Sequence, residues 1–154
     1  MAKYTDRIRK LASYVDAGES VADIGPDHGY LSIWLIREGV SPRVIMTDVA
    51  EGPLKIARGN AEKYGVTDLR LGDGLAPLAP GEVDTVVIAG MGGETIIGIM
   101  EADPEKTASF PKYILQPRTK TAELRSWLAE RYEIVEDIVA EERGRPCPVI
   151  VVRT

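Results

Sequence analysis

A regular alternation of short apolar runs and amphipathic segments is the feature that most restricts the fold of this chain. The apolar runs are strand-like and cover residues 20–24, 43–47, 68–71, 83–89 and 112–116. Helical patterns occupy about residues 4–16, 28–38, 53–64, 94–100 and 120–131. Two more strand-like segments, 132–141 and 148–153, are joined through Arg143-Gly144-Arg145, and such a short link indicates an antiparallel hairpin.

This order of elements predicts an α/β fold with a doubly wound, seven-stranded, mostly parallel sheet and one antiparallel strand from the C-terminal hairpin. The run 83–89 is nearly continuous in β-branched residues, as expected of a central strand that is buried on both faces. Ligands of such sheets bind outside the carboxyl ends of the strands, where the strand order reverses. We therefore expect the functional residues in the loops that follow the first four strands.

The composition is that of an ordinary globular domain, with 154 residues of which 44% are hydrophobic and 28% charged. The single cysteine, Cys147, excludes an internal disulfide, and no stretch approaches the roughly 18 apolar residues that span a bilayer. We expect a soluble, cytoplasmic protein without a membrane partner. Cys147 is expected to be a structural thiol, and no metal site is expected, because partner ligands are missing. The net charge of -5 argues mildly against a nucleic-acid partner.

The loop after the first strand carries acidic residues where a dinucleotide-binding loop would carry glycine. Gly25 follows the strand directly, but Asp27 occupies the middle glycine position of a G-x-G-x-x-G pattern. A carboxylate there would repel phosphate oxygens, so the loop argues against NAD or a nucleotide phosphate. It suits S-adenosylmethionine, which has an ammonium, a sulfonium and no phosphate, with Asp23 and Asp27 as the partners of the positive charge. The alternative is a helix N-cap with a tight turn.

Three further loops fit the same ligand. Asp48 ends the second strand, where an acidic residue can accept both ribose hydroxyls or, alternatively, cap the next helix. Asp73 lies between two glycines and can accept from an adenine amine. The small residues after the central strand leave room for the cofactor and a target base, and Met91 can pack against either. The loops after the second, third and fourth strands thus supply Asp48 with Val49, Asp73 with Gly74, and Ala89, Gly90, Met91 and Gly92.

With these loops placed, the sequence resembles the TrmK-type tRNA (adenine-N1)-methyltransferases of bacteria. The resemblance rests on five segments that follow in order along the chain: VADIGPDH (21–28), Asp48 with EGP (51–53), RLGDGL (70–75), IAGMGG (88–93) and LQP (115–117). It implies the Rossmann-like class I methyltransferase fold, S-adenosylmethionine as cofactor, and methylation of adenine 22 of tRNA. Two features depart from the family. Arg118-Thr119 stands where asparagine is more usual, and residues 1–154 are expected to form one domain without the family's C-terminal helical region.

The implied reaction assigns roles to further residues. Methylation of adenine N1 removes no proton at the reacting nitrogen, so orientation and electrostatics should dominate. Asp27 is expected to favour the cationic product and Tyr30 to stack on the base. His28 could bond the base, fix Asp27 or only cap a helix, and the Gln116 amide could read an adenine edge or only end a strand. Arg7 is expected to hold a cofactor carboxylate or a phosphate.

The interpretation of the whole chain is thus an S-adenosylmethionine-dependent methyltransferase with tRNA as partner and S-adenosylhomocysteine as product. Arg118 and Lys120 would flank the mouth of the site beside Arg7 and could likewise hold phosphates or the cofactor carboxylate. Two alternatives remain open at this point. One is a methyltransferase for a small molecule or a protein, and the other is a non-catalytic cofactor-binding domain.

Overall fold

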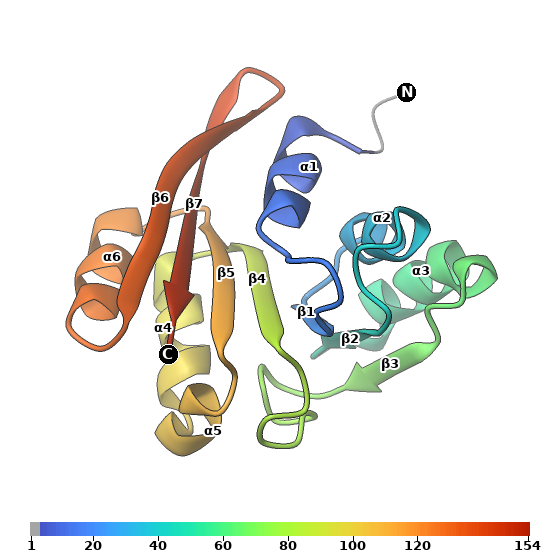
Figure 1. The fold of residues 1–154 in the computed structure, drawn as a ribbon, viewed down its shortest axis with the longest axis horizontal. Helices are drawn as coiled ribbons and strands as arrows, with labels where there is room; N and C mark the ends of the chain where they lie inside the picture. Colours follow the sequence, from blue (N-terminus) through green and yellow to red (C-terminus); the bar gives the residue numbers. More distant parts are fainter. Residues whose placement is uncertain (1–3) are drawn as a thin grey trace.

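Seven strands form one sheet in the order β3-β2-β1-β4-β5-β7-β6 (Figure 1). The structure is a computed structural model and describes residues 4–154, so residues 1–3 of the predicted domain lie outside the described range. The strands are β1 (Val21–Ile24), β2 (Val44–Asp48), β3 (Asp68–Leu71), β4 (Thr85–Met91), β5 (Lys112–Pro117), β6 (Glu133–Glu142) and β7 (Arg145–Arg153). β1 to β5 pair in parallel, and β7 pairs antiparallel with both β5 and β6. The predicted fold class is confirmed.

The strand order reverses at the centre of the sheet. β1 pairs with β2 on one side and with β4 on the other, so the chain builds outward to β3 and then crosses back to β4. The loops that follow β1 and β4 diverge at this point and leave a crevice between them. The carboxyl ends of these two strands therefore position any ligand site.

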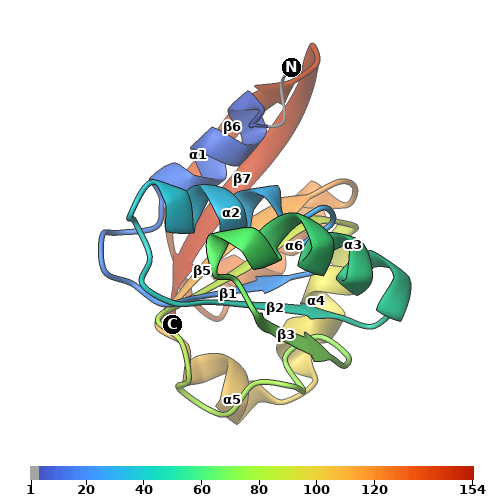
Figure 2. The ribbon, with the colours of Figure 1, turned by 90° about the vertical axis from the view of Figure 1, so that its right-hand side faces the viewer.

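Helices cover both faces of the sheet and enclose two cores (Figure 2). Leu11, Leu35 and Ala57 are buried on one face, and Ile96 and Leu124 are buried on the other. The first face is covered by α1 (Asp6–Ser13), α2 (Tyr30–Arg37) and α3 (Glu51–Ala61), and the second by α4 (Gly93–Glu101), α5 (Pro104–Ala108) and α6 (Thr121–Ala129). No helix within residues 4–154 is long and apolar enough to cross a membrane.

Two predicted boundaries were wrong, and one helix was not predicted, each for a local reason. α2 begins at Tyr30 instead of residue 28, because Asp27 and Gly29 have left-handed backbones with φ of 58° and 82°. β4 continues through Gly90 to Met91, and the register shift between Ala89 and Met91 accommodates the left-handed glycine. The helix α5 has no predicted counterpart, since its five residues are too few to show a helical period.

The C-terminal hairpin is longer than predicted and reaches past the rest of the sheet. β7 begins at Arg145 instead of residue 148, and β6 pairs with it along its whole length. β5 pairs only with the second half of β7, from Ile150 to Arg153. The first half of β7 and the second half of β6 therefore extend beyond β5, beside α1 (Figures 1 and 2). Ala140 and Val149 of the hairpin share a core cluster with the α1 residue Leu11, which holds the hairpin and α1 together.

Candidate functional site

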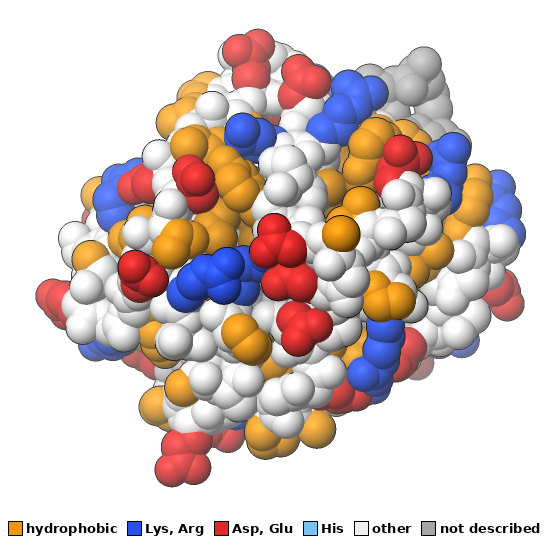
Figure 3. Space-filling model, in the orientation of Figure 1, with side chains coloured by type: hydrophobic (Ala, Val, Ile, Leu, Met, Phe, Trp, Pro, Cys, Tyr) orange, Lys and Arg blue, Asp and Glu red, His pale blue; other side chains and the backbone are white. Residues whose placement is uncertain are grey.

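A cleft of about 1390 Å³ opens at the carboxyl ends of β1 and β4, where the strand order reverses. Its walls come from the loops after β1, β2, β4 and β5, from α1, and from the tip of the β6–β7 hairpin. Figure 3, in the orientation of Figure 1, shows the other side of the molecule, where acidic and basic side chains lie side by side near the centre. The volume exceeds the roughly 300–1,000 Å³ of a site for one small molecule. The cleft therefore has room for a cofactor and part of a second reactant.

Asp23 is the buried acid of this cleft. It lies in β1, is 4% exposed, and its Oδ2 accepts a hydrogen bond of 3.0 Å from the Ser32 hydroxyl of α2. Burial raises the pKa of Asp23 to about 6, although the Ser32 hydrogen bond and the charge of Arg7 lower it. Burial makes the ionised form of a carboxyl group unfavourable when the group is alone. A neighbouring cation stabilises the ionised form, because it compensates for the lost hydration. The position of Asp23 suits a positively charged ligand group.

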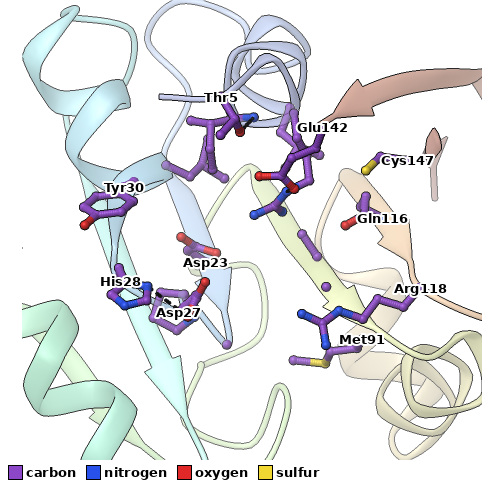
Figure 4. A pocket seen from close by; sticks show the side chains of 18 of the residues that line it. Thr5, Asp23, Asp27, His28, Tyr30, Met91, Gln116, Arg118, Glu142 and Cys147 are labelled. Carbon is purple, nitrogen blue, oxygen red and sulfur yellow. Dashed lines mark hydrogen bonds and ion pairs between the residues drawn. The ribbon is translucent and has the colours of Figure 1, made fainter. Parts of the chain in front are cut away.

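Asp27, His28 and Tyr30 form a connected group on the loop after β1 (Figure 4). His28 Nδ1 lies 3.2 Å from Asp27 Oδ1, and the His28 ring stacks on Tyr30 with centroids 5.5 Å apart and planes 11° apart. The carbonyl of His28 accepts a hydrogen bond of 2.8 Å from Asn60 Nδ2 of α3, which fixes the backbone of the loop. The Asp27 side chain remains 76% exposed. It is therefore held in place yet open to a ligand.

Two glycines leave the floor of the cleft without side chains. Gly25 has a φ of 67°, and a Cβ at this position would lie 2.6 Å from Met91 Cε. Gly90 has a φ of 78° and faces the cleft from β4. Both positions need glycine for the left-handed backbone. A flat or extended ligand can therefore approach the backbone of β1 and β4 closely.

Asp48 lies at the end of β2 and lines the cleft beside the loop from β1. Its Oδ1 accepts a hydrogen bond of 3.0 Å from the amide of Ala50, the N-cap residue of α3. This bond stabilises the turn before α3, but α3 has no side-chain cap, so the alternative that Asp48 caps this helix is wrong. A carboxylate has several lone-pair sites, so this bond leaves Oδ2 and part of Oδ1 for ribose hydroxyls.

The opposite wall is formed by Gln116, Arg118 and an ion pair between α1 and the hairpin (Figure 4). Arg7 Nε lies 2.8 Å from Glu142 Oε2, so the predicted anion-binding arginine already has an acidic partner. Gln116 is 4% exposed, and its Nε2 donates to the carbonyl of Pro117 at 3.0 Å. The amide oxygen of Gln116 is therefore the atom that can accept from a ligand.

Most of the predicted site residues line this cleft, and four do not. Those lining it are Arg7, Asp23, Gly25, Asp27, His28, Tyr30, Asp48, Ala89, Gly90, Met91 and Gln116. Val49 is 66% exposed outside it, and Asp73 is exposed on its own loop. Gly74 and Gly92 have packing roles, since a Cβ would lie 3.0 Å from Ile99 Cγ2 at Gly74 and 3.0 Å from Thr119 Oγ1 at Gly92.

Several residues of the hairpin line the cleft without having been predicted. They are Glu142, Arg143, Arg145, Pro146 and Cys147. The signal was present in the sequence: in an antiparallel hairpin after five parallel units, the turn lies at the same edge as the carboxyl ends of the parallel strands. Burial, and then the charge of Glu142, raises the pKa of the Cys147 thiol, which keeps it protonated. No cluster of His, Cys, Asp and Glu within residues 4–154 could hold a metal ion.

Comparison with known proteins places this geometry in a family. The model of the family described as "Methyltransferase domain" matches residues 4–150. The tRNA (adenine(22)-N(1))-methyltransferase of Bacillus subtilis is 35% identical over 153 residues, which are 97% of this chain and 64% of that protein. The chain thus spans slightly less than two thirds of the length of this curated relative.

Solved structures give the same result. A putative tRNA (m1A22) methyltransferase of Streptococcus pneumoniae, in complex with S-adenosyl-L-methionine, superposes with a TM-score of 0.90 at 36% identity, over 96% of this chain and 72% of that one. M. capricolum TrmK with S-adenosyl-homocysteine superposes with a TM-score of 0.83 at 29% identity, over 96% and 67%. The chain belongs to the methyltransferase-domain family and, within it, to the TrmK family.

Proposed function

We propose that this chain binds S-adenosylmethionine in the cleft and transfers its methyl group to N1 of an adenine in tRNA. The observation that carries the proposal is the arrangement of the acids Asp23, Asp27 and Asp48 around a glycine floor at the sheet's switch point. The relatives named for this reaction support it. Their ligands, S-adenosyl-L-methionine and S-adenosyl-homocysteine, are those that the acidic loop favours.

The residues of the cleft fit the cofactor group by group. Asp23, whose buried carboxyl lacks a full cationic partner, would bind the ammonium. Asp48 would accept from the ribose hydroxyls through the oxygen that the Ala50 amide leaves available. Gly25 and Gly90 would allow the thioether region to lie against the backbone, where any side chain would obstruct it. Arg7 would bind the cofactor carboxylate only if its ion pair with Glu142 rearranges. Arg7 is therefore the least direct of these contacts.

When bound, the cofactor supplies an electrophilic methyl group on a sulfonium. The ring nitrogen N1 of adenine attacks the methyl carbon, the carbon–sulfur bond breaks, and the positive charge passes from sulfur to the adenine ring. No proton leaves N1, so the chain needs no strong base at the reacting atom. Asp27, exposed in the cleft and held by His28, would stabilise the charge that develops on the ring.

The adenine must be presented with its Watson–Crick edge free. Tyr30 lies in the cleft with one ring face against His28, so its remaining surface can contact a base. The oxygen of the Gln116 amide can accept from the exocyclic amine, since the nitrogen is engaged by Pro117. Together these groups would orient the base relative to the methyl group, which is the main contribution expected of the enzyme.

The test measures S-adenosylhomocysteine binding by calorimetry and then methyl transfer to an unmodified tRNA transcript. The matched control is the same transcript with guanine at position 22, the position named for the B. subtilis relative. We expect cofactor binding, transfer to the adenine transcript only, and 1-methyladenosine in the digested product. Cofactor binding without transfer to any tRNA would refute the proposal and favour another substrate.

A further inference from the structure

The two arginines at the tip of the β6–β7 hairpin have no acidic partner, unlike half of the twelve arginines of the described chain. Arg143 and Arg145 line the cleft, as does Arg118 at the end of β5. Within residues 4–154 none of these three forms an ion pair with an acidic side chain. Six other arginines do have acidic partners, namely Arg7, Arg9, Arg43, Arg70, Arg125 and Arg131. Three of the six arginines without an acidic partner in residues 4–154 therefore lie at the mouth of one cleft, in a chain whose net charge is -5.

The backbone of the hairpin turn shows that arginine is an unfavourable choice for its own position. Arg143 and Gly144 both have left-handed φ angles, 52° and 76°, between paired strand residues Glu142 and Arg145. Two-residue turns of this kind favour asparagine or glycine first, because other side chains are strained at positive φ. An arginine in this place costs folding stability. Its side chain is thus expected to serve an interaction outside the turn.

The hairpin tip is held rigidly over the cleft. The Arg7–Glu142 ion pair joins the residue before the turn to α1, and both side chains are largely shielded, at 18% and 26% exposed. Ala140 packs in the α1 core cluster below this pair. Arg143 also lines a second hollow of about 260 Å³, between the tip and the start of α1, together with Tyr4 and Arg9. A guanidinium held on a fixed hairpin can donate two N–H groups to one carboxylate or phosphate with little loss of side-chain freedom.

We propose that Arg143 and Arg145 bind the RNA phosphates that flank the target adenine, with Arg118 completing the grip from β5. This inference rests on the proposed function. A base whose N1 enters the cleft must leave its helix, so its two flanking phosphates lie at the mouth where these side chains gather. Guanidinium groups match phosphate oxygens in charge and geometry.

The test uses the chain of residues 1–154 with Arg143→Gln and Arg145→Gln combined. The control is Arg153→Gln, at the far end of the same strand, exposed and outside the cleft. Affinity for an unmodified tRNA transcript is measured with saturating S-adenosylhomocysteine between about 50 and 200 mM salt. We expect the double variant to bind on the order of tenfold to a hundredfold more weakly at low salt. The slope of log affinity against log salt should become shallower by about 1.4 to 1.8, and the control should match the wild type.

A single substitution separates charge from folding. Arg143→Asn removes the charge and places asparagine before Gly144, the pair that two-residue hairpin turns prefer. We expect this variant to unfold at an equal or higher temperature and yet to bind tRNA more weakly. Unchanged tRNA affinity and an unchanged salt slope in both variants would overturn the inference.

Three other outcomes are decisive. If S-adenosylhomocysteine affinity falls as much as tRNA affinity, the arginines hold the cofactor carboxylate, and the phosphate assignment is wrong. If the wild type binds tRNA with the expected slope but methylates none, the proposed reaction fails while the phosphate grip stands. A wild type that binds no tRNA at all refutes both.

Discussion

Replacing Asp23 by asparagine should make the folded protein more stable and its cofactor binding weaker. Asp23 is 4% exposed, and its pKa is raised from 3.8 to about 6, chiefly by burial. Asparagine has nearly the same shape, and its carbonyl oxygen can still accept the Ser32 hydroxyl hydrogen bond. The substitution therefore removes the charge while keeping the contact.

The sign and size of the stability effect follow from the two pKa values. The folded chain holds the Asp23 proton up to about pH 6, whereas the unfolded chain releases it near pH 3.8. The contribution of Asp23 to the unfolding free energy is thus most favourable below about pH 4, and falls as the pH rises through about 6. Since each pH unit corresponds to about 1.4 kcal/mol, this fall amounts to about 3 kcal/mol. The variant lacks this loss.

The assay is urea unfolding of the wild type and Asp23→Asn at several pH values between about 4 and 8. The difference in unfolding free energy should grow in favour of the variant by about 2.5 kcal/mol across this range, with most of the change between pH 4 and 6. Asp6→Asn is a matched control, because the Asp6 side chain is 79% exposed on α1. Parallel stability curves for wild type and Asp23→Asn would refute the reasoning.

Cofactor binding should show the opposite preference. If the ionised Asp23 binds an ammonium, S-adenosylhomocysteine affinity of the wild type falls by about tenfold per pH unit below pH 6. The affinity of Asp23→Asn should be lower at pH 8 and nearly independent of pH between 5 and 8, as measured by calorimetry at each pH. An equal pH dependence in both proteins would show that another group binds the ammonium.

Three further substitutions test other parts of the structure. Asp48→Ala should weaken S-adenosylhomocysteine binding by roughly 1–3 kcal/mol in calorimetry, the scale of a lost hydrogen-bond partner, and an unchanged affinity would remove Asp48 from the ribose. Asp27→Asn tolerates the left-handed backbone and should lower kcat by about tenfold or more with little change in cofactor affinity, so equal losses would leave Asp27 a binding residue only. Glu82→Gln should lower the unfolding free energy by about 2 kcal/mol at pH 7, because Arg70 lowers the pKa of Glu82 to about 2. That deficit should shrink as the pH falls from about 4.5 toward 2, and a deficit that stays constant over this range would exclude the ion pair as its cause.

The sheet could be predicted from the sequence because its signals are local and repeated. Each predicted parallel strand is a short segment followed by glycine, proline or aspartate, and each main helix is long enough to show its period. The boundaries failed where single residues adopt unusual backbone angles. Asp27 at a φ of 58° and Gly90 within β4 follow from tertiary packing, and no propensity scale anticipates them.

The site was predicted less completely than the fold. Loops after parallel strands could be assigned to the cleft by a general rule, and that rule places Asp23, Asp48 and Gly90 correctly at its edge. The same rule assigned Val49, Asp73, Gly74 and Gly92 to the cofactor, and these four residues do not line the cleft. Gly74 and Gly92 are small because α4 and the loop at Thr119 pack against them, a reason that only the folded structure reveals.

The net charge illustrates why a sum over the chain is a weak guide to a binding surface. Charges in solution are screened beyond about 8 Å at physiological salt, so a ligand interacts with the groups nearest to it. The cleft contains two such neighbourhoods, with Asp23 and Asp27 near its floor and Arg143 and Arg145 at the hairpin. A cationic cofactor and an anionic RNA can each meet a complementary charge in one cleft, because Glu142 neutralises Arg7 between the two regions. The overall charge of -5 therefore reflects the remaining surface more than the chemistry of the site.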